Sequence, residues 1–419
     1  MIRIRLIATL ICFAHVVGAQ DSLQYYFTEA RKARGINDTI AYYAHITAAH
    51  RVHPTHPTIL YHAAIASAQL HKSDESSRYL RKLLMINANA DLSIPEFRNV
   101  SNINELSSLQ GDLRKEIIQS DTAFLINNKT LHIECIATGE DDKTFYLGSI
   151  HQRKIIRRDK NGNVTDFTPS GHDGLTAVFG IKIDRKKNIL WAASSPIPEI
   201  INYTGKEISG LFKFDLKSGK LLARYTPDTI ESKEHIFGDL TLDNKGRPFI
   251  SDSKNNIIFT LNDASGKLEP FFSSTEFKNL QGIAFNKDNT ALFIADYVKG
   301  VYKVDVTSRN LMRLKENFEQ STKSIDGLTF YNNGLIAIQN SIRPMRVTRY
   351  DVDEKSNALG DFEIIDRAHP AFNEPTIGCV SGDYFYYIAN SQWGGYTDQH
   401  TLKDETQLQP VVVLKYKLK

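Results

Sequence analysis

The chain has 419 residues, of which 41% are hydrophobic and 24% are charged, and its formal net charge is +3. This composition is ordinary for a soluble globular protein with a sizeable core. Lysine and arginine are scattered among aspartate and glutamate rather than gathered in a basic run, so we expect no nucleic-acid partner, which would need a basic face.

The first 19 residues have the three parts of a secretory signal. Arg3 and Arg5 form a basic start, residues 6–17 an apolar core, and residues 17–19 a small-residue cleavage site. A membrane anchor is the alternative, but this core is shorter than the roughly 20 residues that span a bilayer. We therefore predict a signal peptide over residues 1–19, a secreted or periplasmic protein, and no membrane span.

Residues 20–116 are predicted to form an α-helical domain, because apolar residues recur there at helical spacing between Gly and Pro breaks. Its segment HPTHPTILYHAAIASAQLHKSDESSRYLRKLLMI resembles a tetratricopeptide (TPR) repeat, and at most two or three such repeats fit. TPR-like helices either present a groove to a peptide or pack on an adjacent domain. We favour a helical cap and keep a protein partner as the alternative.

From residue 117 onward the chain repeats one unit. Its clearest copy, QGIAFNKDNTALFIADYVKGVYKVD (Gln281–Asp305), reads as three strands joined by two turns, which is an antiparallel meander. The copies start near Glu134, Phe179, Asp239, Gln281, Asp326 and Thr376, at intervals of 45, 60, 42, 45 and 50 residues. This period indicates propeller blades. We therefore predict a mainly β fold, a monomeric six-bladed β-propeller over residues 117–419, with residues 121–126 closing the ring against the last blade.

Two cysteines, Cys135 and Cys379, lie in the first and last copies, which are neighbours in a closed ring. An oxidising compartment would permit a disulfide between them. Small buried strand residues are often simply part of the core, so both interpretations stay open.

The residues at the repeat starts should converge on one mouth of the central channel. They include the carboxylates of Glu134, Asp239 and Asp326 and the amide of Gln281. Uncompensated carboxylates are costly inside a small ring, and a hard cation would compensate them. Oxygen ligands of this kind favour calcium and, less strongly, magnesium.

The motif QGIAFNKDNTALFIADY resembles the blade motif of the SMP-30/gluconolactonase/LRE-like superfamily, which includes the paraoxonases. The resemblance implies a calcium-dependent six-bladed propeller with Glu134, Gln281 and Asp326 as metal ligands. Three positions depart from the pattern. Gln281 and Gly238 stand where the superfamily has asparagines, and Phe179 replaces the histidine that serves as base in the paraoxonases.

If the site is active, the resemblance implies hydrolysis of a lactone or ester, with Asp239 or Asp326 as the base for water. His172 and His235 lie in connecting segments near the same mouth, and Trp393 stands among glycines in a composition suited to stacking on a sugar or a peptide. These three are candidate substrate contacts, or ordinary loop residues. The alternative is a non-enzymatic propeller that binds a ligand or protein around a structural metal ion.

Overall fold

The computed structural model describes residues 19–139, 141–227, 234–262, 264–317 and 319–419, with side chains described from residue 23 onward. The predicted signal peptide, residues 1–19, therefore lies almost entirely outside the described residues. The chain divides into two compact units, Met1–Leu113 and Arg114–Lys419. None of the helices in the described part of the chain is long and apolar enough to cross a membrane.

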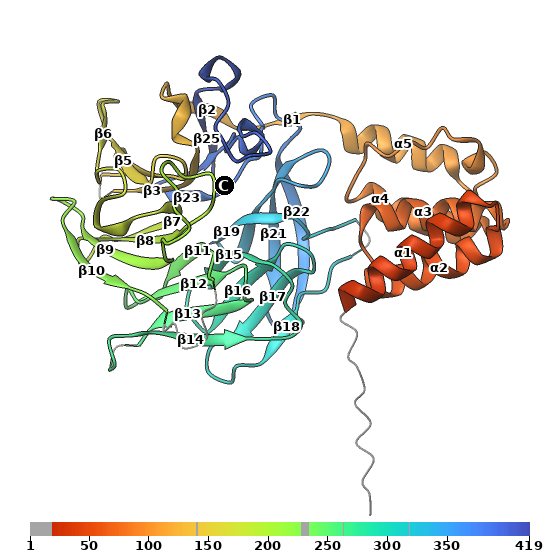
Figure 1. The fold of residues 1–419 in the computed structure, drawn as a ribbon, viewed down its shortest axis with the longest axis horizontal. Helices are drawn as coiled ribbons and strands as arrows, with labels where there is room; N and C mark the ends of the chain where they lie inside the picture. The colour runs from red at the N-terminus through yellow and green to blue at the C-terminus, as the bar shows by residue number, and fades with distance from the viewer. Residues whose placement is uncertain (1–18, 140, 228–233, 263, 318) are drawn as a thin grey trace, which may run out of the picture. The chain divides into compact units, whose positions relative to one another are not determined.

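The first unit is helical. Its elements are α1 (Ala19–Gly35), α2 (Thr39–Val52), α3 (Pro57–Gln69), α4 (Ser73–Leu84), η1 (Pro95–Phe97) and α5 (Ile103–Arg114) (Figure 1). Asp38 begins α2 by accepting a hydrogen bond from the N–H of Ala41, and Pro57 begins α3 at a position that needs no donor. The first four helices pack consecutively, α1 against α2, α2 against α3, and α3 against α4. Small buried residues of α3, among them Ala63 and Ala66, allow this close packing.

The second unit consists of six antiparallel sheets, so the predicted six-bladed propeller is confirmed. The blades contain, in order, β3 (Ile133–Thr138), β4 (Phe145–Ser149), β5 (Lys154–Arg158) and β6 (Val164–Asp166); β7 (Ala177–Asp184), β8 (Ile189–Ser195), β9 (Gly210–Asp215) and β10 (Leu221–Tyr225); β11 (Phe237–Leu242), β12 (Pro248–Asp252), β13 (Ile257–Leu261) and β14 (Leu268–Ser273); β15 (Leu280–Phe285), β16 (Ala291–Asp296), β17 (Gly300–Asp305) and β18 (Leu311–Arg313); β19 (Ile325–Tyr331), β20 (Gly334–Gln339), β21 (Arg346–Asp353) and β22 (Ala358–Arg367); and β23 (Gly378–Ser381), β24 (Tyr384–Ile388) and β25 (Val411–Lys417).

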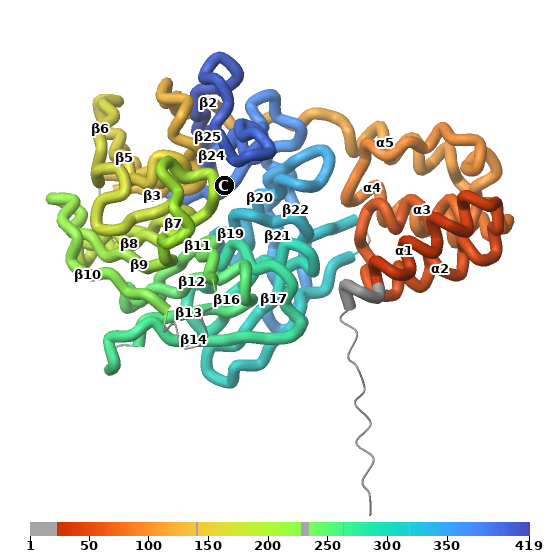
Figure 2. Tube along the Cα trace, viewed as in Figure 1, coloured from red at the N-terminus to blue at the C-terminus, as the bar shows by residue number. Residues whose placement is uncertain are grey.

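The ring closes through a strand from the start of this unit. β2 (Asp121–Ile126) pairs antiparallel with β25, as predicted, and Figure 2 shows the two strands side by side. The inner strands β3, β7, β11, β15, β19 and β23 contact one another in that order, and β23 contacts β3. Closure therefore joins segments that are almost 300 residues apart in sequence.

A second closing contact was not predicted. The short strand β1 (Ile117–Ile118) pairs with β22 and gives the fifth blade a fifth strand. The buried carboxylate of Asp366, at the end of β22, accepts hydrogen bonds from the N–H of Gln119 at 2.9 Å, from the Ser120 hydroxyl, and from Tyr387 Oη of the sixth blade at 2.7 Å. Residues 117–126 thus hold the fifth and sixth blades together.

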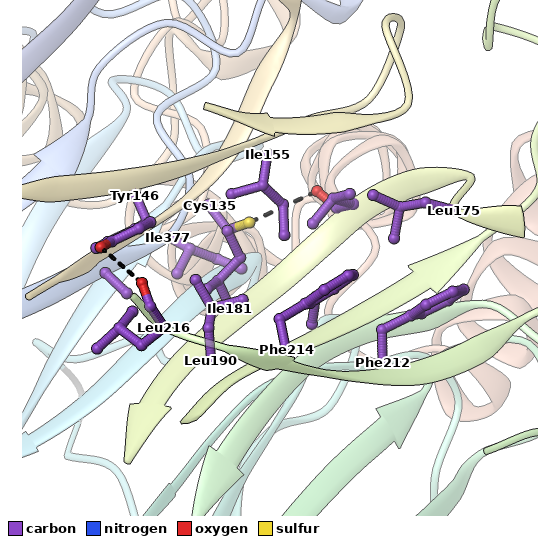
Figure 3. Packing of buried hydrophobic residues seen from close by; sticks show 13 residues of the cluster. Cys135, Tyr146, Ile155, Leu175, Ile181, Leu190, Phe212, Phe214, Leu216 and Ile377 are labelled. Carbon is purple, nitrogen blue, oxygen red and sulfur yellow. Dashed lines mark hydrogen bonds between the residues drawn. The ribbon is translucent and has the colours of Figure 1, made fainter. Parts of the chain in front are cut away.

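The core lies between the blades. Figure 3 shows the cluster between the first two, in which Cys135 and Ile155 of the first blade meet Leu190 and Phe212 of the second. Cys135 Sγ lies 3.5 Å from the carbonyl oxygen of Val178. Both cysteines are free thiols, so of the two interpretations the core one is correct and no disulfide forms. The physical reason is that Cys379 packs against a different cluster, between the first and sixth blades.

The closing strand provides a test of the fold. Phe124 of β2 is buried and its ring lies 4.9 Å from that of Phe145, whereas its neighbour Leu125 is 53% exposed. We expect Phe124→Ala to reduce the free energy of unfolding by about 3 kcal/mol, because it leaves a cavity at the closure, and Leu125→Ala to change it by less than about 0.5 kcal/mol. Urea denaturation followed by tryptophan fluorescence measures this, because both tryptophans, Trp191 and Trp393, lie in the propeller. Equal effects of the two variants would contradict the closure.

Candidate functional site

The residues of the candidate site come from β-bulges near the start of five inner strands. In β3, β7, β11, β15 and β19 the pairing with the next strand shifts register close to the start of the strand. The residues left out of register are Glu134, Phe179, Gly238, Gln281 with Gly282, and Asp326. Such a β-bulge redirects the side chain of the unpaired residue, and here it occurs in five of the six blades.

The bulges require close approach between neighbouring inner strands. A Cβ atom on Gly282 would lie 2.5 Å from the main-chain nitrogen of Leu328, and one on Gly327 would lie 3.0 Å from the main chain of Ile377. Both glycines follow a bulge residue directly, so the pairs Gln281-Gly282 and Asp326-Gly327 have a structural basis.

All five bulges open into one cavity of about 240 Å³. The residues that line it are Glu134, Phe179, Ile236, Gly238, Ser253, Gln281, Tyr297, Asp326, Asn340, Ser341, Arg343, Glu374 and Trp393. At the opposite ends of the inner strands a wider cavity of about 750 Å³ contains Lys182 and several asparagines. Among the described residues that line this second cavity there is no carboxylate, so the predicted chemistry belongs to the first mouth.

Glu134 is buried, Asp326 is half-buried, and the two carboxylates share one hydroxyl. Thr376 Oγ1 lies 2.7 Å from Asp326 Oδ2 and 3.2 Å from Glu134 Oε1. A hydroxyl has a single proton, so Thr376 can donate to only one of the two carboxylates at a time. Thr376 therefore compensates the charge of only one of the two carboxylates at any moment.

A chain of hydrogen bonds through Ser391, His132 and Tyr396 holds the Glu134 carboxylate in place. The Ser391 hydroxyl donates to Glu134 Oε2, His132 Nε2 lies 3.1 Å from Ser391 Oγ, and Tyr396 Oη lies 2.7 Å from His132 Nδ1. Trp393 Nε1 donates to the other carboxylate oxygen at 3.4 Å. His132 and Ser391 were not predicted from the sequence. Only the closed ring brings them, 259 residues apart, into contact.

Burial controls the pKa values of these groups. It raises the pKa of Glu134 to about 8, with the nearby Asp326 charge as the second cause. Burial likewise raises the pKa of Asp326 to about 6, and the charges of Asp239 and Glu374 act in the same direction. Burial lowers the pKa of His132 to about 3, which keeps its ring neutral. In the absence of a cation, the site therefore favours a protonated Glu134 near neutral pH.

The other predicted catalytic group, Asp239, does not line the cavity. Its Oδ1 accepts the N–H of Leu240 at 2.7 Å and its Oδ2 accepts the N–H of Ile283 at 3.3 Å. In the third blade the bulge residue is Gly238, and Asp239 takes the place that glycine holds after Phe179, Gln281 and Asp326. The carboxylate therefore ties two blades together through main-chain donors.

The two predicted histidines also lie outside the lining. His172, in η3 (His172–Gly174), is 60% exposed and its Nδ1 lies 2.7 Å from Asp173 Oδ2. His235 Nδ1 lies 2.6 Å from Asp252 Oδ2, a buried carboxylate that also accepts the main-chain N–H groups of Ile236 and Lys254. Of the predicted substrate contacts, Trp393, at the start of η4 (Trp393–Gly395), lines the cavity.

Gln281 and Gly238 fit each other. Gln281 Nε2 donates to Asn279 Oδ1 at 2.7 Å, which leaves its carbonyl oxygen Oε1 on the side of Gly238. A Cβ atom on Gly238 would lie 3.1 Å from that oxygen. The longer amide of Gln281 thus extends over a residue that has no side chain.

Glu374 is a further carboxylate that the sequence did not reveal. It lies between β22 and β23 in a left-handed backbone conformation with φ of 62°, which is rare for residues other than glycine and asparagine. Its Oε2 is buried and has no hydrogen-bond partner among the described protein atoms, although Glu374 lines the cavity. Buried carboxylate oxygens normally have a hydrogen-bond partner or bind an ion, so this oxygen is a candidate contact for water, a ligand or a cation.

The oxygen atoms that line the cavity are of the chemical types that bind hard cations. Three carboxylates and the Gln281 amide line the cavity, which are the oxygen ligands that calcium prefers. Within the described ranges, no three His, Cys, Asp or Glu side chains are grouped closely enough to hold a metal ion. A cation at this cavity would therefore need the Gln281 amide and water as well as Glu134 and Asp326.

The sequence matches no protein-family profile and no curated protein. Solved structures with a similar fold include a gluconolactonase from Xanthomonas campestris, with 11% identity over 70% of this chain and 88% of that one, and a TM-score of 0.47. A calcium-binding regucalcin from Agrobacterium tumefaciens has 16% identity over 71% and 94%, with a TM-score of 0.49. A virginiamycin B lyase from Staphylococcus aureus has 14% identity over 73% and 89%, with a TM-score of 0.45. The likeness is one of fold.

The raised pKa of Glu134 predicts a pH dependence of stability. Between about pH 4.5 and pH 8 the folded protein keeps a proton on Glu134 that the unfolded chain has lost, so stability falls as the pH rises through this window. We expect Glu134→Gln, which cannot ionise, to reduce this slope in EDTA. The matched control is Glu276→Gln, at an exposed residue. Urea denaturation at several pH values measures the slope, and a variant slope equal to that of the parent would contradict the assignment.

Proposed function

We propose that this chain is a calcium-dependent hydrolase of lactones or esters that acts at the 240 Å³ cavity. The observation that carries the proposal is the set of carboxylates on its wall. The buried Glu134 and the half-buried Asp326 both contact the Thr376 hydroxyl, and Glu374 keeps an unpartnered buried oxygen. The signal-like first 19 residues support an extracytoplasmic site of action.

In this proposal Glu134, Asp326 and the Gln281 amide hold the cation. A bound calcium ion would polarise the carbonyl group of the substrate and stabilise the negative charge that develops on its oxygen. Ser391, Trp393 and Thr376 keep the Glu134 carboxylate in place through their hydrogen bonds, so it needs little reorganisation when a ligand binds.

Glu374 is the carboxylate that we assign as general base. Asp239 is occupied by main-chain donors outside the cavity, and Asp326 is occupied by Thr376 and Asn340. Glu374 Oε2 has no such partner and is available to accept a proton from water. The water oxygen then bonds to the carbonyl carbon, the acyl C–O bond breaks, and the proton passes to the leaving oxygen. The products are a carboxylic acid and a hydroxyl group, which are one molecule for a lactone.

Calcium binding can be tested without any substrate. We expect excess calcium to raise the melting temperature of the parent by several degrees, because a ligand at 100 times its dissociation constant adds about 2.7 kcal/mol to the stability of the folded state. Asp326→Asn should lose this shift, whereas Asp288→Asn, an exposed turn residue, should retain it. Differential scanning fluorimetry in calcium and in EDTA makes the comparison. A parent that shows no shift would remove the metal from the proposal.

Catalysis needs a separate measurement. We expect the calcium-loaded parent to hydrolyse members of a panel of lactones and aryl esters. Glu374→Gln should lower kcat by about 100-fold or more, the usual contribution of a general base, while the calcium-induced shift in melting temperature persists. Glu276→Gln should have the activity of the parent. If no compound is turned over faster than by Asp326→Ala, the hydrolase proposal fails and the alternative, a binding propeller with a structural ion, takes its place.

A further inference from the structure

The second cavity, at the mouth opposite the candidate site, is lined by charge of one sign. Its volume is about 750 Å³, and the charged side chains on its described lining are Lys182 of β7 and Lys287 of the turn after β15. A volume of this size is typical of small-molecule sites. The formal net charge of the chain is only +3 over 419 residues, so the local excess of positive charge is not a general property of the protein.

Lys182 stands at a position of the inner strands where neighbouring blades have small, neutral side chains. It lies three residues after the bulge residue Phe179. The residues three positions after the bulge residues of the next three blades also line the second cavity, and they are Thr241, Ala284 and Thr329. Because these blades use threonine or alanine at the same place, packing of the ring does not require a lysine there.

The charge of Lys182 acts on other inner strands but forms no ion pair with them. Burial raises the pKa of Asp239 in β11 and of Cys379 in β23, and in both cases the Lys182 charge is the second cause and opposes the rise. Among the described residues, no carboxylate oxygen lies within 4.0 Å of the Lys182 nitrogen. The Asp239 carboxylate is occupied by main-chain N–H groups instead, so the Lys182 charge is left for a ligand.

The turns around the second cavity add neutral hydrogen-bond donors. Hydrogen bonds connect the turns of the third and fourth blades, because the N–H of Asn244 donates to Asn289 Oδ1, and Asn289 Nδ2 donates to the carbonyl oxygen of Asn286 at 3.0 Å. In the fifth blade Asn332 and Asn333 form a two-residue turn with φ of 44° and 58°, a conformation that asparagine tolerates. The side-chain amides of Asn244, Asn332 and Asn333 are exposed and form no hydrogen bond with another described residue, so they are available to donate to a ligand.

We infer that the second cavity binds a small molecule that carries a phosphate group, and that Lys182 and Lys287 supply the positive charges for its oxygen atoms. A phosphate monoester has a charge of about −2 near neutral pH and several oxygen acceptors. The two lysines match this charge, and the amides of the turns can donate to the remaining acceptors. A carboxylate fits less well, because its planar pair of oxygens is best matched by an arginine, and the described lining contains none. The inference does not use the proposed hydrolysis, which takes place at the other mouth.

Calorimetric titration with inorganic phosphate in EDTA tests the inference. At an ionic strength fixed with sodium chloride, we expect saturable binding at a single site. Lys182→Gln and Lys287→Gln should each weaken the binding by about 10-fold, the size of one charge-assisted hydrogen bond. Lys182→Arg, which keeps the charge, should retain most of the affinity. The matched control is Lys278→Gln, at an exposed lysine just before β15 and thus at the opposite end of this strand from Lys287, and it should bind phosphate like the parent.

Further titrations decide the ligand class and the place of binding. Glycerol phosphate should bind and glycerol should not, and succinate should bind about 10-fold more weakly than phosphate or worse. Arg343→Gln, at the cavity of the candidate site, should leave the phosphate affinity unchanged. The inference is overturned if phosphate does not bind, if glycerol phosphate is no better than glycerol, if succinate equals phosphate, or if Lys278→Gln weakens binding as much as Lys182→Gln and Lys287→Gln do. A loss of binding in Arg343→Gln instead would place the anion at the other cavity and also overturn it. Calcium and lactones are absent from every titration, so a failure of the hydrolase proposal would not change these results.

Discussion

The β-bulge near the start of the inner strands is the constraint on which the candidate site depends. Side chains alternate between the two faces of a strand, and in a propeller both faces of a blade pack against neighbouring blades. A bulge leaves one residue unpaired and redirects its side chain. Repeated in five inner strands of a closed ring, it brings Glu134, Phe179, Gln281 and Asp326 to one cavity. The glycines that follow several of these residues allow the strands to lie close enough for this.

Placing several carboxylates near the axis is electrostatically unfavourable, and the packing of the ring holds them there. Burial disfavours the charged forms of Glu134 and Asp326 and raises the pKa of both; the charge of Asp326 adds to the effect on Glu134, and the charges of Asp239 and Glu374 add to the effect on Asp326. Neither group can move away, because Thr376 bridges them and the chain of Ser391, His132 and Tyr396 supports Glu134. Because the charged carboxylates are disfavoured here, binding a proton or a cation stabilises the site more than it would stabilise exposed carboxylates. The same residues are therefore the ones assigned to the proposed function.

Loops of the last two blades add groups that the inner strands do not supply. Arg343 follows β20, Glu374 precedes β23, and Trp393 follows β24. All three line the cavity beside the bulge residues. Loops on a rigid scaffold are a common place for functional residues, because their sequences can vary without disturbing the core. Here they add a carboxylate, a guanidinium group and an indole ring to the cavity lining.

The sequence by itself determined the architecture. The regular spacing of its strand units predicted six blades, and residues 121–126 were recognised as the closing strand, because both are properties of local pattern and chain order. It also placed Glu134, Gln281 and Asp326 together, since each opens a repeat. Only the tertiary structure decided which neighbour of a bulge faces the cavity. A shift of one residue turns a side chain to the other face, so Gly238 lies at the cavity and Asp239 does not. His132, Ser391, Arg343 and Glu374 lie outside the repeat pattern, and only ring closure and loop conformation bring them to the site.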